Sequence, residues 1–256
     1  MLHDIKAVIF DWAGTMIDFG CFAPTLAFVD VFAAFDIEVS VHDARRPMGI
    51  PKRAHVETMF GSPDIKRKWQ TRYGHMPTQK DINHVYEAFI PINESFTADH
   101  ATLVPGALPM LKKLDQRKIK IGSTTGYTRS IMEKILPIAA AQGYQPLNCV
   151  CSNDLIEGRP GPLGMYQCMV DLGVYPPHAV VKVDDTAPGI AEGVAAGCQT
   201  VGVALSSNYV GLTYQEVLNL SRQEVDEIRT TTTEKLQAAG ADYVIDTIAD
   251  LPSLLG

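Results

Sequence analysis

Short runs of β-branched and other apolar residues recur along the chain, and this recurrence restricts the fold more than any other feature of the sequence. The runs alternate with segments of helical character, which is typical of a parallel sheet covered by helices. We therefore predict an α/β fold with a doubly wound, Rossmann-like parallel sheet. The predicted strands are residues 7–10, 119–122, 147–150, 179–183, 200–203 and 243–245.

Helix signals fill the spaces between the later runs. Pro105 and Gly106 open the first of these segments, and Gly197 stands where a glycine commonly ends a helix. Residues 206–240 form a longer excursion between the last two runs, for which we predict no element. The predicted helices are residues 105–117, 128–142, 162–172, 188–197 and 247–255.

The alternation breaks once, because residues 11–118 contain no convincing strand. Ser40 and Asp43 have the spacing of a capping box, and Pro24 and Pro51 suit the first turn of a helix. This stretch is therefore predicted to be helical. Its predicted helices are residues 24–35, a short one after Ser40, and residues 51–60, 65–73 and 78–96.

An all-helical insert after the first strand of a parallel sheet should form a separate lid. We predict a helical cap domain at residues 19–100, inserted into a core domain made of residues 1–18 and 101–256.

Composition excludes several classes of protein. The chain has 22 Lys+Arg against 29 Asp+Glu, a net charge of −7, and is 46% hydrophobic, which argues against disorder and against nucleic acid as a partner. No apolar stretch approaches the roughly 18 residues that a membrane span needs. No secretory signal is visible, and an odd number of cysteines fits a reduced, cytoplasmic setting with free, mostly buried thiols. The cysteines are Cys21, Cys149, Cys151, Cys168 and Cys198.

Polar and charged residues follow several of the predicted strands. Asp11 ends the first run, Ser-Thr-Thr-Gly at residues 123–126 ends the second, and the pair Asp184 and Asp185 ends the fourth. Arg159 lies between the third and fourth runs. Because ligands bind beyond the carboxyl ends of parallel strands, these groups should meet at one edge of the sheet. Carboxylates for Mg²⁺, hydroxyl and N–H groups for phosphate oxygens and an arginine for negative charge indicate phosphoryl chemistry.

Each of these features alone is common in ordinary turns and helix caps. Together and in this order they resemble the four motifs of the haloacid dehalogenase superfamily, and the predicted helical insert resembles that superfamily's cap. The usual first motif is Asp-x-Asp, whose second acid protonates the leaving oxygen, but this chain has Ala13 there. That replacement, with Arg-Arg-Pro-Met-Gly at residues 45–49, Lys52, His55 and residues 122–127, resembles the phosphonatase family.

The replacement at Ala13 has a chemical reason. A phosphate ester releases an alkoxide, so a nearby acid helps, whereas a C–P bond releases a carbanion. An aldehyde β to phosphorus can condense with an amine to a protonated imine that accepts this electron pair. Lys52 follows Pro51 at the start of a predicted helix, where the helix dipole disfavours an ammonium ion. We expect the nearby Arg45, Arg46 and Arg53 to add to this activation.

The resemblance implies Mg²⁺-dependent hydrolysis of phosphonoacetaldehyde to acetaldehyde and phosphate. It implies that Asp11 forms an aspartyl-phosphate and that Lys52 forms a Schiff base. Mg²⁺ is then held by Asp11, the backbone carbonyl of Ala13 and Asp185, with Asp184 in support. Some members carry the last motif as Asp-x-x-x-Asp, but the fourth residue after Asp185 is Gly189, so the share of each aspartate in metal binding stays open.

The same resemblance implies the residues around the substrate. Thr125, Gly126 and Arg159 hold the phosphonate, and Met48, His55, Tyr127 and Cys21 line the pocket or assist proton transfer. His55 lies about one helical turn from Lys52, so its side chain can reach the same pocket. A partly buried histidine that only packs within the cap is an equally good interpretation of His55. Met48 likewise fits a packing role as well as a role in the pocket.

The resemblance also implies a homodimer, with the small phosphonate as the ligand. Phe28, Phe32 and Phe35 form an apolar stripe that would serve either a dimer contact or the packing of the cap.

Three other functions compete with this reading. A phosphomonoester phosphatase or a phosphomutase of the same superfamily would lack its acid at Ala13. A signalling receiver domain would place paired acids after the first strand, whereas here the pair comes late. A binding module without catalysis would have no need of Asp11.

Overall fold

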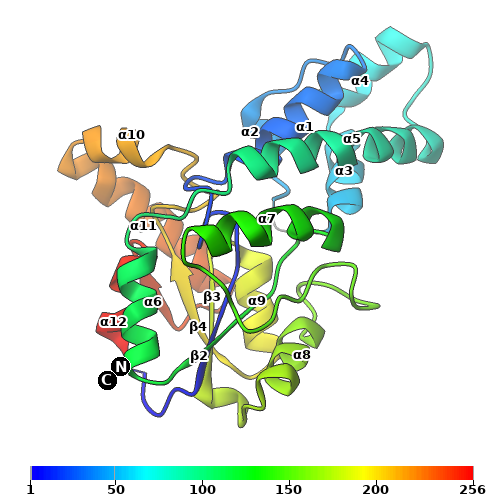
Figure 1. The fold of residues 1–256 in the computed structure, drawn as a ribbon. Coiled ribbons are helices and arrows are strands. Elements are labelled where there is room, and N and C mark those ends of the chain that lie inside the picture. Colours follow the sequence, from blue (N-terminus) through cyan, green and yellow to red (C-terminus); the bar gives the residue numbers. More distant parts are fainter. Residues whose placement is uncertain (1, 49, 256) are drawn as a thin grey trace.

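The computed structural model describes residues 2–48 and 50–255, so Gly49 of the Arg-Arg-Pro-Met-Gly segment lies outside the described residues. A five-stranded parallel sheet in the order β2-β1-β3-β4-β5 forms the centre of the molecule (Figure 1). This confirms the predicted α/β fold with a doubly wound parallel sheet. The strands are β1 (Ala7–Phe10), β2 (Lys120–Ser123), β3 (Val180–Asp184), β4 (Gln199–Val203) and β5 (Tyr243–Ile245).

The two central strands are buried along their whole length, as expected for strands covered on both faces. In β1, Val8 and Phe10 belong to the hydrophobic cluster on one face, whereas Ala7 and Ile9 belong to the cluster on the other. Helices α6 (Ala107–Gln116), α7 (Arg129–Ala141) and α12 (Leu251–Leu254) contribute to the first cluster, and α8 (Leu163–Leu172) contributes to the second. The sheet is therefore packed between two apolar layers.

One predicted strand does not form. Residues 147–150 run along the outer edge of β2, joined by a bond from the Leu147 N–H to the Ile121 carbonyl (2.8 Å) and by a single bridge between Thr124 and Val150. Leu147 is 69% exposed, so the segment has no continuous buried face to fix its register. The prediction of a regular strand there is wrong.

The excursion at residues 206–240 contains two helices that were not predicted, α10 (Tyr214–Asn219) and α11 (Arg222–Ala238). Each begins with a capping box, formed by Thr213 with Glu216 and by Ser221 with Glu224. Helix α9 (Ala187–Ala195) follows β3 directly, with Thr186 as its N-cap.

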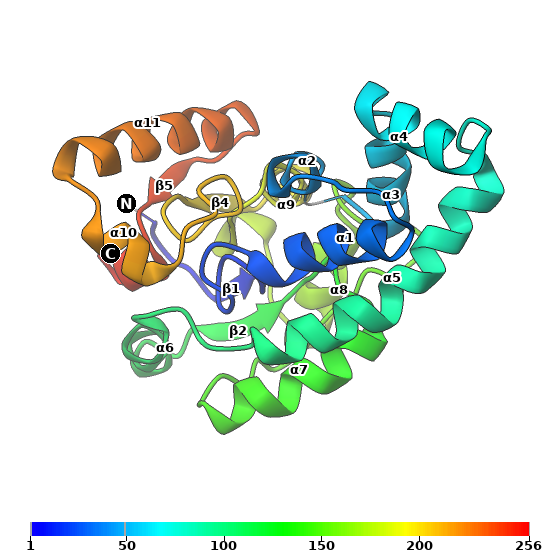
Figure 2. The ribbon, with the colours of Figure 1, turned by 90° about the horizontal axis from the view of Figure 1, so that it is seen from above.

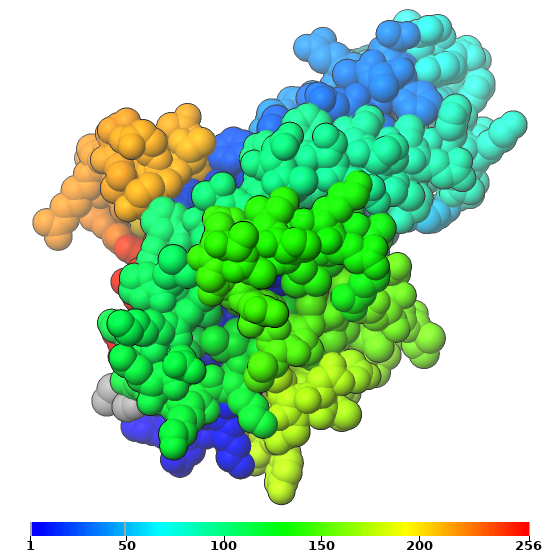
Figure 3. All heavy atoms as spheres, in the orientation of Figure 1, coloured from blue at the N-terminus to red at the C-terminus, as the bar shows by residue number. Residues whose placement is uncertain are grey.

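Five helices lie between β1 and α6, and they pack around a hydrophobic cluster of their own. Figure 2 shows α1 and α5 side by side, and Figure 3 shows the group as a lobe projecting from the rest of the molecule. Phe28 and Phe32 are fully buried in this cluster and Phe35 packs against it, so the packing of the helices accounts for the apolar stripe. The five helices are α1 (Phe22–Ala34), α2 (Val41–Arg45), α3 (Lys52–Phe60), α4 (Pro63–Tyr73) and α5 (Gln79–Asp99).

The turn between β1 and the helical lobe is fixed by a buried carboxylate. Asp18 accepts hydrogen bonds from the N–H groups of Phe22 (3.0 Å) and Ala23 (2.8 Å), the first residues of α1. Asp18 and Cys21 both have positive φ angles, 53° and 54°, which only a strongly determined turn imposes on residues with side chains. This turn directs α1 over the carboxyl ends of the strands (Figure 1).

Candidate active site

Three buried aspartates meet at the carboxyl ends of β1 and β3. Asp11 follows β1, Asp184 ends β3 and Asp185 comes next, and the pairing of Phe10 with Val183 brings them together. One oxygen of each carboxylate lies within 4.8 Å of the others. The acids that follow the first and fourth predicted runs therefore lie together, as predicted.

The electrostatics of these acids indicate a cation site. Burial raises the pKa of Asp11 to about 6, helped by the charge of Asp184. Burial also raises the pKa of Asp185 well above its usual value, with Asp11 and Asp184 adding to the effect. Packed carboxylates of this kind are costly unless a positive charge joins them, and three carboxylates are the hard oxygen donors that a divalent metal ion prefers. The residues present thus fit a divalent metal.

The two neighbouring aspartates differ in their partners. Asp184 lies 3.2 Å from Arg159 Nη1 and 3.1 Å from Lys182 Nζ. Burial works to raise the pKa of Asp184, but the two cations outweigh it and lower the pKa. Asp185 instead accepts from neutral donors, the Asn208 N–H at 2.9 Å and the Thr15 hydroxyl at 3.2 Å. Nearby cations therefore balance the negative charge of Asp184 better than that of Asp185.

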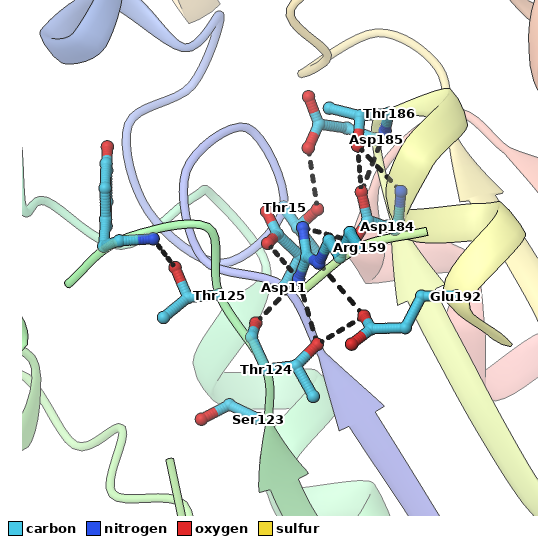
Figure 4. A network of polar contacts seen from close by, with 12 residues as sticks. Asp11, Thr15, Ser123, Thr124, Thr125, Arg159, Asp184, Asp185, Thr186 and Glu192 are labelled. Atoms are coloured by element: carbon cyan, nitrogen blue, oxygen red, sulfur yellow. Dashed lines mark hydrogen bonds and ion pairs between the residues drawn. The ribbon is translucent and has the colours of Figure 1, made fainter. Parts of the chain in front are cut away.

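Arg159 connects the acids into one network (Figure 4). Its Nη2 atom lies 2.8 Å from Asp11 Oδ1, and its Nε atom lies 3.0 Å from Glu192 Oε2. The same Nη2 atom donates to the carbonyl and the hydroxyl of Thr124, each at 2.9 Å. Arg159, which the resemblance assigns to phosphonate binding, is thus buried against the acid that follows β1.

Lys182 and Glu192 belong to the site but were not predicted from the sequence. Lys182 is fully buried, and its Nζ atom lies 2.6 Å from the Thr124 hydroxyl and 3.1 Å from Glu192 Oε2. The signal was present, because a lysine inside the apolar run that ends at the paired aspartates must have buried acidic partners. Glu192 lies on the buried side of α9 and gave no comparable signal.

A cleft beside these acids brings together most of the predicted site residues. Lys52 is the first residue of α3, as predicted, and is half-buried. His55, Asp184 and Asp185 are not among the residues that line the cleft. The predicted residues that line it are Asp11, Ala13, Cys21, Met48, Lys52, Thr125, Gly126, Tyr127 and Arg159.

Lys52 lies among largely apolar side chains, and its pKa is lowered. Its Nζ atom lies 3.7 Å from the Met48 sulfur and 5.7 Å from the ring centroids of Phe28 and Tyr127. Burial lowers the pKa of Lys52; negative charge on Cys21 and Asp11 opposes this, and Arg159 lowers the pKa further. The net shift is downward.

The arginines of the helical lobe do not provide this effect. Arg45 donates to the carbonyls of Gly20 (2.7 Å) and Asn208 (3.1 Å), and Arg53 donates to Asn83 (2.8 Å). Arg46 is exposed. The cation that acts on Lys52 is Arg159, so the expectation for Arg45, Arg46 and Arg53 is corrected.

His55 lies one layer behind the cleft. Its ring stacks on Phe28 at 3.7 Å between centroids, and its Nε2 atom lies 2.9 Å from the Ala44 carbonyl. Burial and the charge of Lys52 lower the pKa of His55 well below its usual value, so the ring is neutral and its Nε2–H donates to Ala44. Its predicted role towards the substrate stays a prediction.

The loop after β2 supplies the hydroxyl and amide groups. The Thr124 hydroxyl accepts from Lys182 and Arg159 and donates to Glu192, whereas Thr125 and Gly126 line the cleft. The Thr125 N–H donates to the Val150 carbonyl at 3.0 Å, and the Thr125 hydroxyl accepts from the Tyr127 N–H at 3.1 Å. The Tyr127 hydroxyl is buried and has no hydrogen-bond partner among the described residues.

Comparison with known proteins gives the family. A family model described as haloacid dehalogenase-like hydrolase matches residues 5–197. A phosphonoacetaldehyde hydrolase from Paraburkholderia phytofirmans is 45% identical over 250 residues, which cover 98% of this chain and 94% of that protein. One from Klebsiella pneumoniae is 44% identical over 99% of this chain and 95% of that protein. The chain belongs to the phosphonoacetaldehyde hydrolase family.

Solved structures agree with this family. The crystal structure of a phosphonoacetaldehyde hydrolase-like protein from Oleispira antarctica matches with a TM-score of 0.95 and 40% identity, covering 98% of this chain and 91% of that one. A hydrolase from Pseudomonas syringae, 17% identical with a TM-score of 0.68, shows the shared fold alone. Within the described residues, every helix is too short or too polar to cross a membrane.

Proposed function

We propose that this enzyme hydrolyses the C–P bond of phosphonoacetaldehyde to give acetaldehyde and phosphate. One observation carries the proposal: Lys52 from α3 and Asp11 from the end of β1 line the same cleft, and Ala13 stands there without an acid. The curated relatives of that name, which match nearly the whole chain, support it.

The covalent steps follow from these two residues. The neutral Lys52 amine adds to the aldehyde carbon, and the adduct loses water and takes up a proton from solvent, which gives a protonated imine. An oxygen of Asp11 bonds to phosphorus while the C–P bond breaks, and the electron pair of that bond moves into the imine to form an enamine. The enamine carbon takes up a proton, and water then releases acetaldehyde from Lys52. A second water cleaves the phosphate from Asp11.

The lowered pKa of Lys52 serves the first of these steps, because only the neutral amine attacks a carbonyl. Arg159 lowers that pKa and also lies beside the Asp11 carboxylate, so one buried cation acts on both reacting side chains.

Mg²⁺ is the ion we assign to the three acids. Asp11, the carbonyl of Ala13 and Asp185 would hold it, and Asp184, already paired with Arg159 and Lys182, would support them. A bound Mg²⁺ reduces the repulsion between a carboxylate and an anionic phosphonate.

The substrate residues follow from the same cleft. Thr125, Gly126 and Arg159 bind the phosphonate oxygens in this proposal, and Met48, Tyr127 and Cys21 surround the two-carbon chain. Burial raises the pKa of Tyr127 well above its usual value, so its unpartnered hydroxyl keeps its proton and is available as a donor to the substrate.

Residues 19–100 act as a cap in this proposal, and residues 1–18 and 101–256 act as the core that carries Asp11. The site is complete only when cap and core meet, so opening and closing accompany turnover. The enzyme works in the cytoplasm as a homodimer in this proposal.

A phosphate-release assay tests the function. The purified enzyme with Mg²⁺ should release phosphate from phosphonoacetaldehyde at least 100-fold faster than from simple phosphomonoesters, and Lys52→Arg should lose the former activity because a guanidinium cannot form the imine. Faster hydrolysis of phosphomonoesters would support a phosphatase or phosphomutase of the same superfamily instead.

A further inference from the structure

Cys149 and Cys151 form a pair of neighbouring thiols in the segment that runs along the outer edge of β2. Both side chains pack against the hydrophobic cluster on one face of the sheet, whereas Val150 between them belongs to the cluster on the other face. This alternation is that of an extended segment, in which residues two apart point the same way. Both thiols are free, and Cys149 is half-buried whereas Cys151 is buried. A small oxidant can therefore reach the first thiol, with the second beside it.

The two thiols differ in reactivity. The hydrogen bond with the Cys151 thiol lowers the pKa of Cys149, and burial opposes this. Contact with the Ser123 hydroxyl and the positive charge of Arg129 lower that pKa further. Arg129 is held beside the pair because its Nη2 atom donates to the Cys149 carbonyl at 2.8 Å. The hydrogen bond between the thiols and burial both raise the pKa of Cys151. A partly exposed thiolate near a cation is the reactive form of cysteine, so Cys149 is the nucleophile of the pair.

Val150 connects this pair to the turn at the end of β2, which carries Ser123, Thr124 and Thr125 (Figure 4). The Val150 N–H donates to the Ser123 carbonyl at 2.9 Å, and the Val150 carbonyl accepts from the Thr125 N–H at 3.0 Å. Thr125 lines the cleft and binds the phosphonate in the proposed function. A movement of Val150 would therefore move a residue that binds the substrate.

A disulfide within this segment requires such a movement. Two residues of extended chain span roughly 6.6 Å between Cα atoms. A disulfide most often joins Cα atoms about 5.5–6 Å apart, with the Cβ atoms about 3.8 Å apart. Residues 149–151 must contract to form the bond, and this contraction turns the Val150 peptide groups away from Ser123 and Thr125.

We propose that Cys149 and Cys151 form a reversible redox switch, in which a disulfide formed by hydrogen peroxide displaces Thr125 and turns the enzyme off. The Cys149 thiolate attacks one peroxide oxygen, the O–O bond breaks, and a sulfenic acid and hydroxide form. The Cys151 thiol then attacks this sulfur, the S–O bond breaks, and water leaves. Two electrons pass from the two sulfurs to the peroxide, and a dithiol reductant reverses the change by exchange. The effect on activity rests on the proposed function, whereas the disulfide does not.

Mass spectrometry after treatment of the purified enzyme with hydrogen peroxide tests the disulfide. Fragment spectra of the alkylated, non-reduced wild-type protein should place a loss of two hydrogen atoms on residues 149–151, and dithiothreitol should restore both thiols. In Cys151→Ala, dimedone should label Cys149, because its sulfenic acid has no partner thiol. Absence of the disulfide in the wild type, or of the label on Cys149 in the variant, would overturn the proposal.

Phosphate release from phosphonoacetaldehyde with Mg²⁺ tests the switch. Oxidation should lower kcat/KM of the wild type at least about tenfold, because a small displacement of a substrate residue is that costly, and dithiothreitol should restore it. Cys149→Ser is the matched control, which should have the basal activity of the wild type and keep it through the same treatment. A disulfide that leaves the activity unchanged would overturn the switch.

An equal loss of activity in Cys149→Ser would also overturn the switch, and it would assign the sensitivity to another thiol, such as Cys21 in the cleft. A reduced wild-type enzyme that is inactive on phosphonoacetaldehyde would contradict the proposed function instead. The mass spectra then still decide whether Cys149 and Cys151 form the disulfide.

Discussion

Lys182 Nζ lies 3.1 Å from Asp184 Oδ2, fully buried beneath the edge where the three acids meet. The same ammonium group lies 3.1 Å from Glu192 Oε2, so it balances two buried carboxylates. Removing one member of a buried ion network leaves the others uncompensated, which costs about 3–5 kcal/mol. The network therefore supports the site by making the dense packing of its acids possible.

Removing Lys182 should show how much this network contributes to stability. Lys182→Met should lower the free energy of unfolding by about 3–5 kcal/mol, measured in urea. Adding Glu192→Gln should recover part of the loss, because one uncompensated charge is removed, so the two changes should not be additive. Additive losses would show that Lys182 and Glu192 contribute separately.

The raised pKa of Asp11 predicts a pH-dependent stability of the metal-free protein. A carboxyl whose folded pKa is about 6, above its usual 3.8, binds more protons in the folded state. Its contribution is therefore fully present below about pH 4 and is lost as the pH rises through 6, a difference of roughly 3 kcal/mol.

Asp11→Asn isolates this contribution. In EDTA the variant should be more stable than wild type by about 2–3 kcal/mol at pH 8, and the two proteins should converge near pH 4. A constant difference between pH 4 and 8 would contradict the pKa that burial gives to Asp11. Added Mg²⁺ should remove the advantage, since it stabilises only the protein with the intact carboxylate.

Arg159 should set the reactivity of Lys52. The rate of acetylation of Lys52 in the substrate-free protein should rise with pH and reach its midpoint below the ordinary lysine pKa of 10.5. In Arg159→Met the midpoint should move to higher pH because a charge that lowers the pKa is gone, whereas in Arg159→Lys, the matched control, it should move less. An unchanged midpoint in Arg159→Met would assign the effect to burial alone.

The residue at position 13 should determine whether the site can protonate a leaving alkoxide. Ala13 lines the cleft with Asp11, so Ala13→Asp would place an acid where a leaving alkoxide forms. We expect phosphomonoester hydrolysis to rise by about 10-fold or more, since general acid catalysis contributes up to 10²–10⁴-fold, and Ala13→Asn serves as the control. The same gain in both variants would exclude an acid–base explanation.

Most of the fold could be predicted from the sequence because most elements have a local sequence signal. Strand β1 is a continuous apolar run with Asp11 at its end, and α3 begins at Lys52, directly after Pro51. Residues 147–150 have the composition of a strand, but Leu147 faces solvent and no buried face holds the register. The acids of the site were predictable because parallel strands end at one edge.

The partners of those acids could not be found in the same way. Glu192 joins the network only because α9 packs against β3. The cation that acts on Lys52 is Arg159 and not an arginine close to Lys52 in sequence. The fold brings the loop of Arg159 into contact with Asp11, and the sequence does not show this. At position 189 the sequence shows only that no acid is present. The close fit of Gly189 against the Asp184 carboxyl is visible only in the folded structure.

Trapping with borohydride tests the central claim most directly, because it reports the covalent bond itself. The enzyme is reduced during turnover of phosphonoacetaldehyde and digested, and the peptide that contains Lys52 is examined by mass spectrometry, with Lys52→Arg and borohydride without substrate as controls. The account predicts a reduced two-carbon adduct on Lys52 together with loss of activity. Full retention of activity with an unmodified Lys52 would contradict it.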